Sequence, residues 1–349
     1  MSKRKRKVVT RNDVARKAQV SPSAVSLVLN NTPGVRISKQ TRARILAAAN
    51  ELGYRPSAIA RAVSTGRTHT IGVLLCNTDQ IFEPYTAFLL QGIWPTLREH
   101  QYRLTIDALT KDRDIAIFCR EHAADGVIII APPDNVTGVD LIIDQGYPAV
   151  SVGSELAPEV DYVDLDNSHA AYLATSYLIR MGHRRIAHLT GDIHMSSGRE
   201  RLWGYRRALA EAGIEFDPNI VIESYYGERE KSITHARELL SRRHDHSYTA
   251  VFAGSDEIAG SFVEAAQEIG LGIPEDISVI GINGFPQQTT IVDRSIKLLS
   301  TIRQPFLEIG SRAARLVLQR LNEKETPRAQ KLLLRGELVE GHTVRRLSS

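Results

Sequence analysis

The chain has 349 residues, 42% hydrophobic and 24% charged, which is the composition of a folded globular protein with room for more than one domain. Two cysteines make no disulfide framework, and neither an apolar signal core nor an apolar run of membrane length is present, so we expect a cytoplasmic protein that is neither secreted nor membrane-spanning. The net charge of +4 is unevenly placed, because residues 1–69 carry 15 Lys and Arg against Asp13 and Glu51, whereas the remainder carries 29 basic and 38 acidic residues. This distribution indicates a polyanionic partner for the N-terminal part alone.

Residues 1–9, MSKRKRKVV, are a strongly basic run. We expect a disordered arm that adds nonspecific attraction to phosphate. A nuclear signal and a simply solvated tail are the alternatives.

Residues 10–55 are predicted to form three short helices. Thr10, Ser21 and Ser38 are N-cap candidates, Pro22 suits a first helical position, and Gly53 ends the third helix. The predicted core positions recur at helical spacing, and they are Val14, Ala15, Ala18, Val25, Val28, Leu29, Ile45, Ala48, Ala49 and Leu52.

The first two of these helices surround a tight turn in TRNDVARKAQVSPSAVSLVLN. This is the helix-turn-helix pattern, whose second helix enters the major groove of DNA, although an ordinary α-hairpin has the same spacing. Leu27 is out of phase with the apolar face of the second helix, so we expect it to point away from the core.

Residues 56–69, PSAIARAVSTGRTH, form a joint that is too short for a stable isolated helix in water. We expect this segment to become helical only against a partner.

From residue 70 onward, apolar strands alternate with amphipathic helices. The predicted strands are 71–76, 103–107, 126–131, 149–152, 186–190, 250–253, 278–282 and 299–302, and the predicted helices are 85–100, 168–181, 200–212, 257–269 and 306–322. This alternation predicts parallel sheets covered on both faces, in a segment long enough for two α/β subdomains. Ligands in such folds bind in a crevice at the carboxyl ends of the strands. Cys76 ends a predicted strand, and Cys119 is expected in the core.

Ordered motifs along nearly the whole chain resemble the LacI/GalR family of bacterial transcription regulators. They are DVARKAQVSPSAVSLVLN, TRARILAAANELGYRPSAIARAV, RTHTIGVLL, DGVIII, VDLDN, MGHRRIAHLTG, RERLWGYRRAL, IPEDISVIGING and LSTIRQPFLEIGSRAARLVLQRL. The resemblance implies a helix-turn-helix head (10–55), a hinge helix (56–69) and a periplasmic-binding-protein-like domain (70–349) for effector binding and dimerisation. It also implies a homodimer or tetramer on double-stranded DNA with a pseudo-palindromic operator.

By this resemblance, the base-reading positions of the second helix are Pro22, Ser23 and Leu27. Leu27 replaces a polar or cationic residue of many members, and it suits a thymine methyl because it cannot donate to guanine. Further phosphate-contacting positions are Thr10, Ser21, Ser26 and Asn30, with Arg11 and Lys39 as weaker candidates.

In the joint, Val63 stands where the family inserts a leucine into the minor groove. Valine is shorter and stiffer, so we expect a shallower wedge. Arg55 and Arg61 are expected on phosphate or at the groove edge.

For the effector, the resemblance identifies Arg201 as the anchor, whose guanidinium suits vicinal hydroxyls, carboxylate or phosphate. Asn283 stands where many members have Asp. The other expected contacts are Phe82, Ser197, Tyr226, Ser255 and Asp256. A sugar, polyol or nucleoside fits this set best, and a protein corepressor or no effector are the alternatives.

The sequence supports two other functions less well than transcriptional regulation. A transport receptor of the same fold would need a signal peptide and would lack the helix-turn-helix. An enzyme is not indicated, because the P-loop, GxGxxG, HExxH and GxSxG patterns are missing. His244-Asp245-His246 is interpreted as a solvated loop, and we expect neither a metal nor a cofactor. The prediction is a transcriptional repressor with a small-molecule effector, and whether the ligand induces or corepresses is not indicated.

Overall fold

The computed structural model describes residues 9–30, 34, 36–55, 62, 66–76, 78–110, 114–121, 124–285, 298–323 and 328–347. The chain divides into two compact units, Met1–His69 and Thr70–Ser349. Among the described residues, no helix is both long enough and apolar enough to cross a bilayer.

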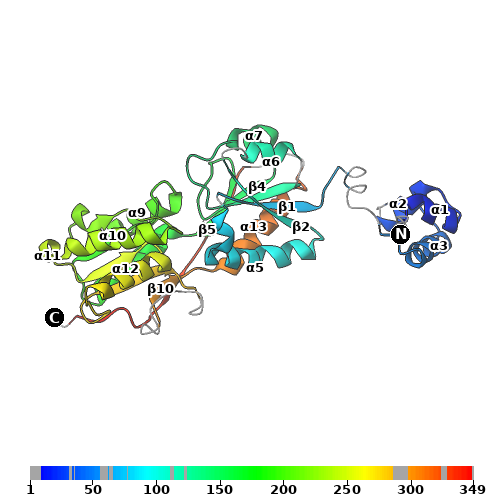
Figure 1. Cartoon of the computed structure of the whole chain (residues 1–349). Coiled ribbons are helices and arrows are strands. Elements are labelled where there is room, and N and C mark those ends of the chain that lie inside the picture. Colours follow the sequence, from blue (N-terminus) through cyan, green and yellow to red (C-terminus); the bar gives the residue numbers. More distant parts are fainter. Residues whose placement is uncertain are drawn as a thin grey trace, which may run out of the picture. The chain divides into compact units, whose positions relative to one another are not determined.

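The first unit contains the three predicted helices, α1 (Arg11–Ala18), α2 (Pro22–Leu29) and α3 (Lys39–Glu51), drawn in blue in Figure 1. All three predicted N-caps are confirmed, since the side chains of Thr10, Ser21 and Ser38 each accept a hydrogen bond from a backbone N–H of the first turn. The buried core consists of Val14, Ala15, Ala18, Val25, Val28, Ile45, Ala48 and Ala49, with Leu29 and Leu52 packed against it.

Leu27 is partly exposed and does not belong to that core, as its phase predicted. Residues 1–8 of the basic arm, Arg61 and Val63 lie outside the described residues. Their predicted roles therefore stay predictions.

The second unit contains two six-stranded sheets. Its strands are β1 (Thr70–Leu75), β2 (Arg103–Ala108), β3 (Gly126–Ile130), β4 (Ala149–Val152), β5 (Asp161–Leu165), β6 (Ile186–Leu189), β7 (Val221–Ile222), β8 (Ala250–Ala253), β9 (Ser278–Asn283), β10 (Ser300–Arg303), β11 (Lys331–Leu334) and β12 (Glu337–Val339). Its helices are η1 (Asp79–Phe82), α5 (Pro84–Glu99), α6 (Ile115–Arg120), α7 (Val139–Gln145), α8 (Asn167–Arg180), α9 (Ser196–Glu211), η2 (Pro218–Ile220), α10 (Arg229–Ser241), α11 (Arg243–His246), α12 (Asp256–Glu268) and α13 (Phe306–Arg320).

The first sheet has the order β11-β5-β4-β3-β1-β2, and its neighbouring strands are all parallel. Because side chains alternate along a strand, Ile71, Val73 and Leu75 of β1 face α5 and α13, whereas Leu74 faces α6 and α7. We call this sheet with its four helices lobe 1.

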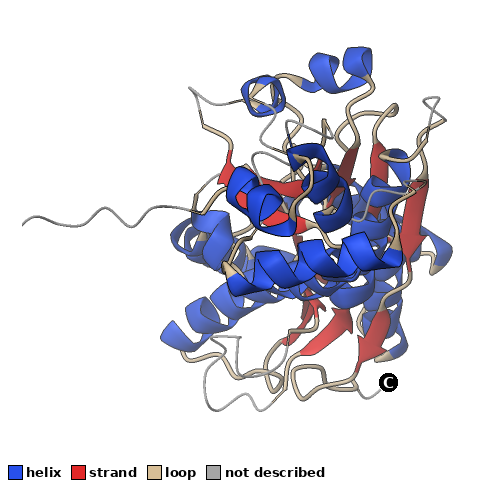
Figure 2. Cartoon of the chain, turned by 90° about the vertical axis from the view of Figure 1, so that its right-hand side faces the viewer, coloured by secondary structure: helices blue, strands red, loops and turns tan. Residues whose placement is uncertain are grey.

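The second sheet has the order β12-β10-β9-β8-β6-β7, and only β12 runs antiparallel to its neighbour. One face is covered by α10 and α12 and the other by α8 and α9. We call this sheet with its helices lobe 2. Figure 2 shows the strands of the second unit enclosed by helices. The predicted fold class, parallel α/β sheets behind a three-helix N-terminal unit, is confirmed.

Several elements were not predicted, namely β5, β7, β11, β12, α6, α7 and α10. His244-Asp245-His246 forms part of the short helix α11 instead of the predicted loop. His244 and Asp245 are exposed, as expected, while His246 lies 3.2 Å from a carboxylate oxygen of Asp217. The chain passes from one sheet to the other near Asp166, Pro305 and Gly336, so α13 and β11 return to lobe 1.

Candidate functional site

The polar face of α2 is the first candidate site. Residues one and four positions apart share this face, and they are Pro22, Ser23, Ser26, Leu27 and Asn30. Val25 and Val28 are buried on the opposite side of the helix. The cap residue Ser21 and its neighbour Ser23 are both exposed, so their hydroxyl groups lie at the surface.

A basic side chain contacts this face. Arg11 of α1 donates a hydrogen bond from Nη1 to Oγ of Ser26, 2.9 Å away, which ties α1 to α2 at the same surface. Arg55 is exposed beyond the end of α3. A partly exposed helix face with hydroxyl groups and a guanidinium group is suited to phosphate and base-edge contacts.

The second candidate site is a cavity of about 570 Å³ in the second unit. Both lobes line it with residues that follow the carboxyl ends of their strands. Lobe 1 contributes Cys76, Asp79, Gln80, Glu83, Pro84, Tyr85, Ala131, Pro133 and Gly153, and lobe 2 contributes Asp192, Met195, Ser197, Arg201, Tyr225, Tyr226, Gly227, Glu228, Ser255, Glu257 and Asn283. The predicted position of a ligand crevice, at the carboxyl ends of the strands, coincides with this cavity.

Arg201 of α9 is the most deeply fixed charge in the cavity wall, and its side chain is 5% exposed. Its Nε donates to Oδ1 of Asn167 at 2.9 Å, and Nη1 donates to the carbonyl of Gly254 and to the hydroxyl of Tyr226. The guanidinium also lies 5.4 Å from the ring centroid of Tyr226. These contacts hold the charge in one orientation toward the cavity.

Asp164 extends this network beneath the cavity. It accepts hydrogen bonds from the Tyr162 hydroxyl and from Nδ2 of Asn167, each at 2.8 Å. Burial raises the pKa of Asp164 above its ordinary value, while these hydrogen bonds and the charge of Arg201 act against that rise.

The remaining predicted effector residues divide into two groups. Ser197, Tyr226, Ser255 and Asn283 line the cavity together with Arg201. Asn283 donates from Nδ2 to Oε2 of Glu257 at 3.0 Å. Their contact with a ligand stays a prediction.

Phe82 and Asp256 do not line the cavity. Phe82 is 86% exposed and does not line the cavity, because the η1 turn directs Gln80 inward and Gln80 accepts a hydrogen bond from the backbone N–H of Cys76. Asp256 accepts hydrogen bonds from Oγ1 of Thr301 and from the N–H of Gly284, so its carboxylate braces β10. Burial raises the pKa of Asp256 to about 7. The structure thus gives no support for a ligand contact by either residue.

Sequence reasoning missed the acidic members of the cavity wall. Asp79 and Glu83 flank Phe82, and Glu257 directly follows the predicted Ser255-Asp256 pair. The rule that ligands bind after the carboxyl ends of strands would have included them, because they follow β1 and β8.

A third group, Asp192, His194 and Glu223, could hold a metal ion among the described residues, since one ligand atom from each lies within 4.8 Å of the others. Two of these side chains already order the loop after β6. Asp192 accepts a hydrogen bond from the N–H of His194, and Glu223 accepts one from the N–H of Ile193. A structural role in the loop accounts for both carboxylates.

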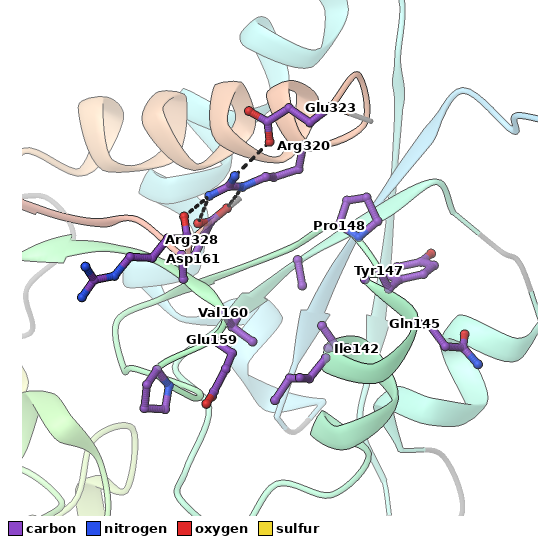
Figure 3. Close-up of a pocket in the computed structure, with 15 residues that line it drawn as sticks. Ile142, Gln145, Tyr147, Pro148, Glu159, Val160, Asp161, Arg320, Glu323 and Arg328 are labelled. Atoms are coloured by element: carbon purple, nitrogen blue, oxygen red, sulfur yellow. Dashed lines mark hydrogen bonds and ion pairs between the residues drawn. The ribbon is translucent and has the colours of Figure 1, made fainter. Parts of the chain in front are cut away.

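Lobe 1 has a separate hollow of about 510 Å³ between α7, the start of β5 and the end of α13. Figure 3 shows Arg320 there, directed at Asp161 and Glu323. Its guanidinium makes two hydrogen bonds of 2.6 Å to Asp161 and one of 2.9 Å to Glu323. These pairs anchor α13 to β5, so the charges serve the packing of lobe 1.

Comparison with known proteins finds a family match in each of the two units. Residues 10–57 match the family described as bacterial regulatory proteins, lacI family, and residues 175–344 match a periplasmic binding protein-like domain. The HTH-type transcriptional repressor PurR of Vibrio atlanticus (strain LGP32) is 32% identical over 348 residues, covering 98% of this chain and 100% of the relative. The ribose operon repressor of Haemophilus influenzae is 33% identical over 322 residues, covering 90% and 92%.

Among solved structures, the complex of the transcriptional regulator CelR with cellobiose aligns with a TM-score of 0.72 at 29% identity. The alignment covers 96% of this chain and 99% of that chain. The likeness therefore includes both units.

Proposed function

The chain belongs to the LacI family of bacterial regulatory proteins, and we propose that it represses transcription by binding an operator. We also propose that a small molecule bound in the cavity alters its affinity for DNA. The observation that carries the proposal is Arg201, a buried guanidinium fixed by hydrogen bonds in a cavity lined by both lobes. We further propose that residues 1–9 act as a basic arm, 10–55 as the DNA-binding head, 56–69 as the hinge, and 70–349 as the effector and dimerisation domain.

For the head, the proposal assigns base contacts to Pro22, Ser23 and Leu27 on the exposed face of α2. Phosphate contacts are assigned to Thr10, Ser21, Ser26 and Asn30, and to Arg55 and Arg61 near the joint. A homodimer would present two such heads to the half-sites of a pseudo-palindromic operator. Such DNA contact places the proposed activity in the cytoplasm.

For the effector, the proposed class is a sugar, polyol or nucleoside that is bound without being converted. The hydrogen-bonding side chains of the cavity suit hydroxyl groups, and cellobiose is the ligand named for the similar CelR complex. Ser197, Tyr226, Ser255 and Asn283 are the proposed contacts beside Arg201.

Contacts between the lobes supply the proposed coupling. Arg199 of α9 makes hydrogen bonds of 2.6 and 3.2 Å to Asp134 of lobe 1. Ser196, at the start of the same helix, accepts a hydrogen bond from the N–H of Glu155 and donates its own N–H to Ser154. Because α9 also carries Arg201, a ligand bound to Arg201 favours one arrangement of these contacts over another, which is how a ligand shifts a conformational equilibrium.

The test is Arg201→Ala, with Arg206→Ala as the matched control. Arg206 lies on the same helix but is exposed, with its guanidinium 4.5 Å from the ring centroid of Phe216. We expect Arg201→Ala to abolish the response of operator binding to ligand, and Arg206→Ala to leave that response unchanged. Fluorescence anisotropy of labelled operator measures both, with circular dichroism as the check on folding. A response unchanged in Arg201→Ala would contradict the assignment.

A further inference from the structure

The walls of the cavity are strongly acidic. They carry five carboxyl groups, those of Asp79, Glu83, Asp192, Glu228 and Glu257, against the single guanidinium of Arg201. Arg201 is already engaged by Asn167, Gly254 and Tyr226. An anionic ligand would therefore meet a field of the same sign, which works against its binding.

Glu83 is the least compensated of these groups. It precedes α5 in lobe 1, its side chain makes no capping hydrogen bond, and among the described residues it has neither a hydrogen-bond donor nor a cation as partner. Its carboxylate reaches lobe 2, where a Cβ added to Gly227 would lie 2.3 Å from Oε1. A half-buried carboxylate in this position lacks the positive partner that burial ordinarily requires.

Glu257 faces the same cavity from the first turn of α12 in lobe 2. It accepts hydrogen bonds from Nδ2 of Asn283, from the side chain of Ser255 and from its own backbone N–H. Both glutamates line the same cavity. Burial raises the pKa of Glu83, and the charges of Glu257 and Asp79 raise it further.

Tyr85 adds a neutral polar group beside them. Its ring packs edge-on against Phe306 at 5.6 Å, and its hydroxyl lies at the cavity wall, where a Cβ added to Gly153 would be 2.5 Å away. Within the described residues, this hydroxyl has no hydrogen-bond partner. It is thus available to a ligand.

From this arrangement we propose that the effector is a hydroxylated amine, such as an amino sugar, whose ammonium group binds between Glu83 and Glu257. An ammonium has three donors and one positive charge, which matches two carboxylates in the wall of one cavity. Its hydroxyl groups are bound by Tyr85 and by Nη2 of Arg201, which takes no part in the contacts with Asn167, Gly254 and Tyr226. Because Glu83 belongs to lobe 1 and Glu257 to lobe 2, one ammonium relieves their repulsion and holds the lobes together. This inference rests on the proposed function of the cavity.

The test compares matched probes on the full-length protein by isothermal titration calorimetry. The pairs are D-glucosamine with D-glucose and D-galactosamine with D-galactose, and N-acetyl-D-glucosamine serves as an uncharged form of the same amine. We expect at least one amine to bind about tenfold or more tightly than its neutral partner, because charge-assisted hydrogen bonds are the stronger ones.

Two variants test whether Glu83 and Glu257 are responsible for the preference for the amine. Glu83→Gln and Glu257→Gln keep the shape of the side chain and remove its charge, and each should abolish the preference for the amine without weakening the neutral sugar. Glu268→Gln is the control, since Glu268 lies on α12 but is exposed and paired with Arg237. It should keep the full preference.

Equal or tighter binding of every neutral partner, or failure of all the amines to bind, would overturn the inference. Operator anisotropy with the same probes separates this result from failure of the proposed function. Release of the operator by a neutral sugar would sustain the effector function and reject the amine. Operator binding that no probe changes would count against both.

Discussion

Leu27 carries the most specific prediction about the head, because its side chain is partly exposed and lies outside the core, whereas Val25 and Val28 of the same helix are buried. An apolar residue on an otherwise polar face is suited to the methyl group of thymine. Direct contacts of this kind distinguish base sequences, whereas phosphate contacts do not.

Leu27→Ala is expected to weaken specific operator binding by about 1 kcal/mol, roughly fivefold, and to leave nonspecific binding unchanged. The control is Leu46→Ala on α3, because Leu46 is a leucine of the same unit and is 49% exposed. Titration of operator and of a scrambled duplex at one salt concentration measures both affinities. Equal losses on the two duplexes would reject base contact by Leu27.

His188 is a buried titratable residue in the core of lobe 2. Its ring stacks on Phe252 at 4.4 Å, and Nδ1 donates to the Phe252 carbonyl at 2.8 Å, while Nε2 has no partner among the described atoms. Burial lowers the pKa of His188 to about 4, from an ordinary value of 6.5. Between pH 6.5 and pH 4, His188 is therefore protonated in the unfolded chain but stays neutral in the folded chain. The free energy of unfolding consequently decreases as the pH falls through that range.

His188→Phe should remove this loss and keep the stacked ring. Lowering the pH from 7 to 5 reduces the free energy of unfolding of both proteins. We expect this reduction to be about 2 kcal/mol smaller in the variant than in the natural protein. His244→Phe, at a position whose side chain is 97% exposed, should leave the pH dependence unaltered. Denaturant unfolding at the two pH values gives the comparison, and identical pH dependence in all three proteins would contradict a neutral buried His188.

Single residues also show where sequence reasoning about the cavity succeeds. Arg201 was found because its position in RERLWGYRRAL resembles the family anchor, and its helix places it in the wall. Phe82 was misplaced because its side-chain direction depends on the η1 turn, which no periodicity in the sequence specifies. Glu83 was also missed, although it follows β1 and the rule that ligands bind after the carboxyl ends of strands would have included it.

Among the secondary-structure elements, those with clear apolar periodicity were predicted to within a few residues. The strand β5 was missed because the buried residues Asp161 and Asp164 interrupt its apolar pattern. Asp161 is paired with the distant Arg320, and Asp164 accepts a hydrogen bond from Tyr162 in the same strand. The strands β11 and β12 are short and partly exposed, and they lie at sheet edges, where burial imposes little pattern.

The start of α1 provides an element-level prediction. Thr10 and Asp13 form a reciprocal capping box, in which each side chain accepts a hydrogen bond from the backbone N–H of the other residue. Thr10→Ala should destabilise the three-helix unit by about 1 kcal/mol, whereas Thr10→Ser should keep most of the cap.

Amide hydrogen exchange in the full-length chain measures this change without DNA. Amides of α1 should exchange roughly fivefold faster in Thr10→Ala than in Thr10→Ser, which is the factor that corresponds to about 1 kcal/mol. Equal protection in the two variants would show that the cap contributes nothing to the unit.

On the scale of the whole molecule, one unit of the chain carries a helix face suited to DNA, and the other carries a cavity lined by two lobes. The sequence pattern was sufficient for the order of these parts, because helical and strand periodicities are local. It was insufficient for the contacts between the lobes, such as Arg199 with Asp134, because they depend on how residues distant in the chain are brought together.

The most direct test of the central claim is fluorescence anisotropy of the purified protein with DNA from upstream of its own gene. The titration is run at fixed salt with and without a panel of sugars, polyols, nucleosides and amino sugars. We expect much tighter binding to this DNA than to a scrambled duplex of the same length, and a change of that affinity by one class of compound. Binding that does not distinguish the two duplexes would contradict the account of a sequence-specific repressor.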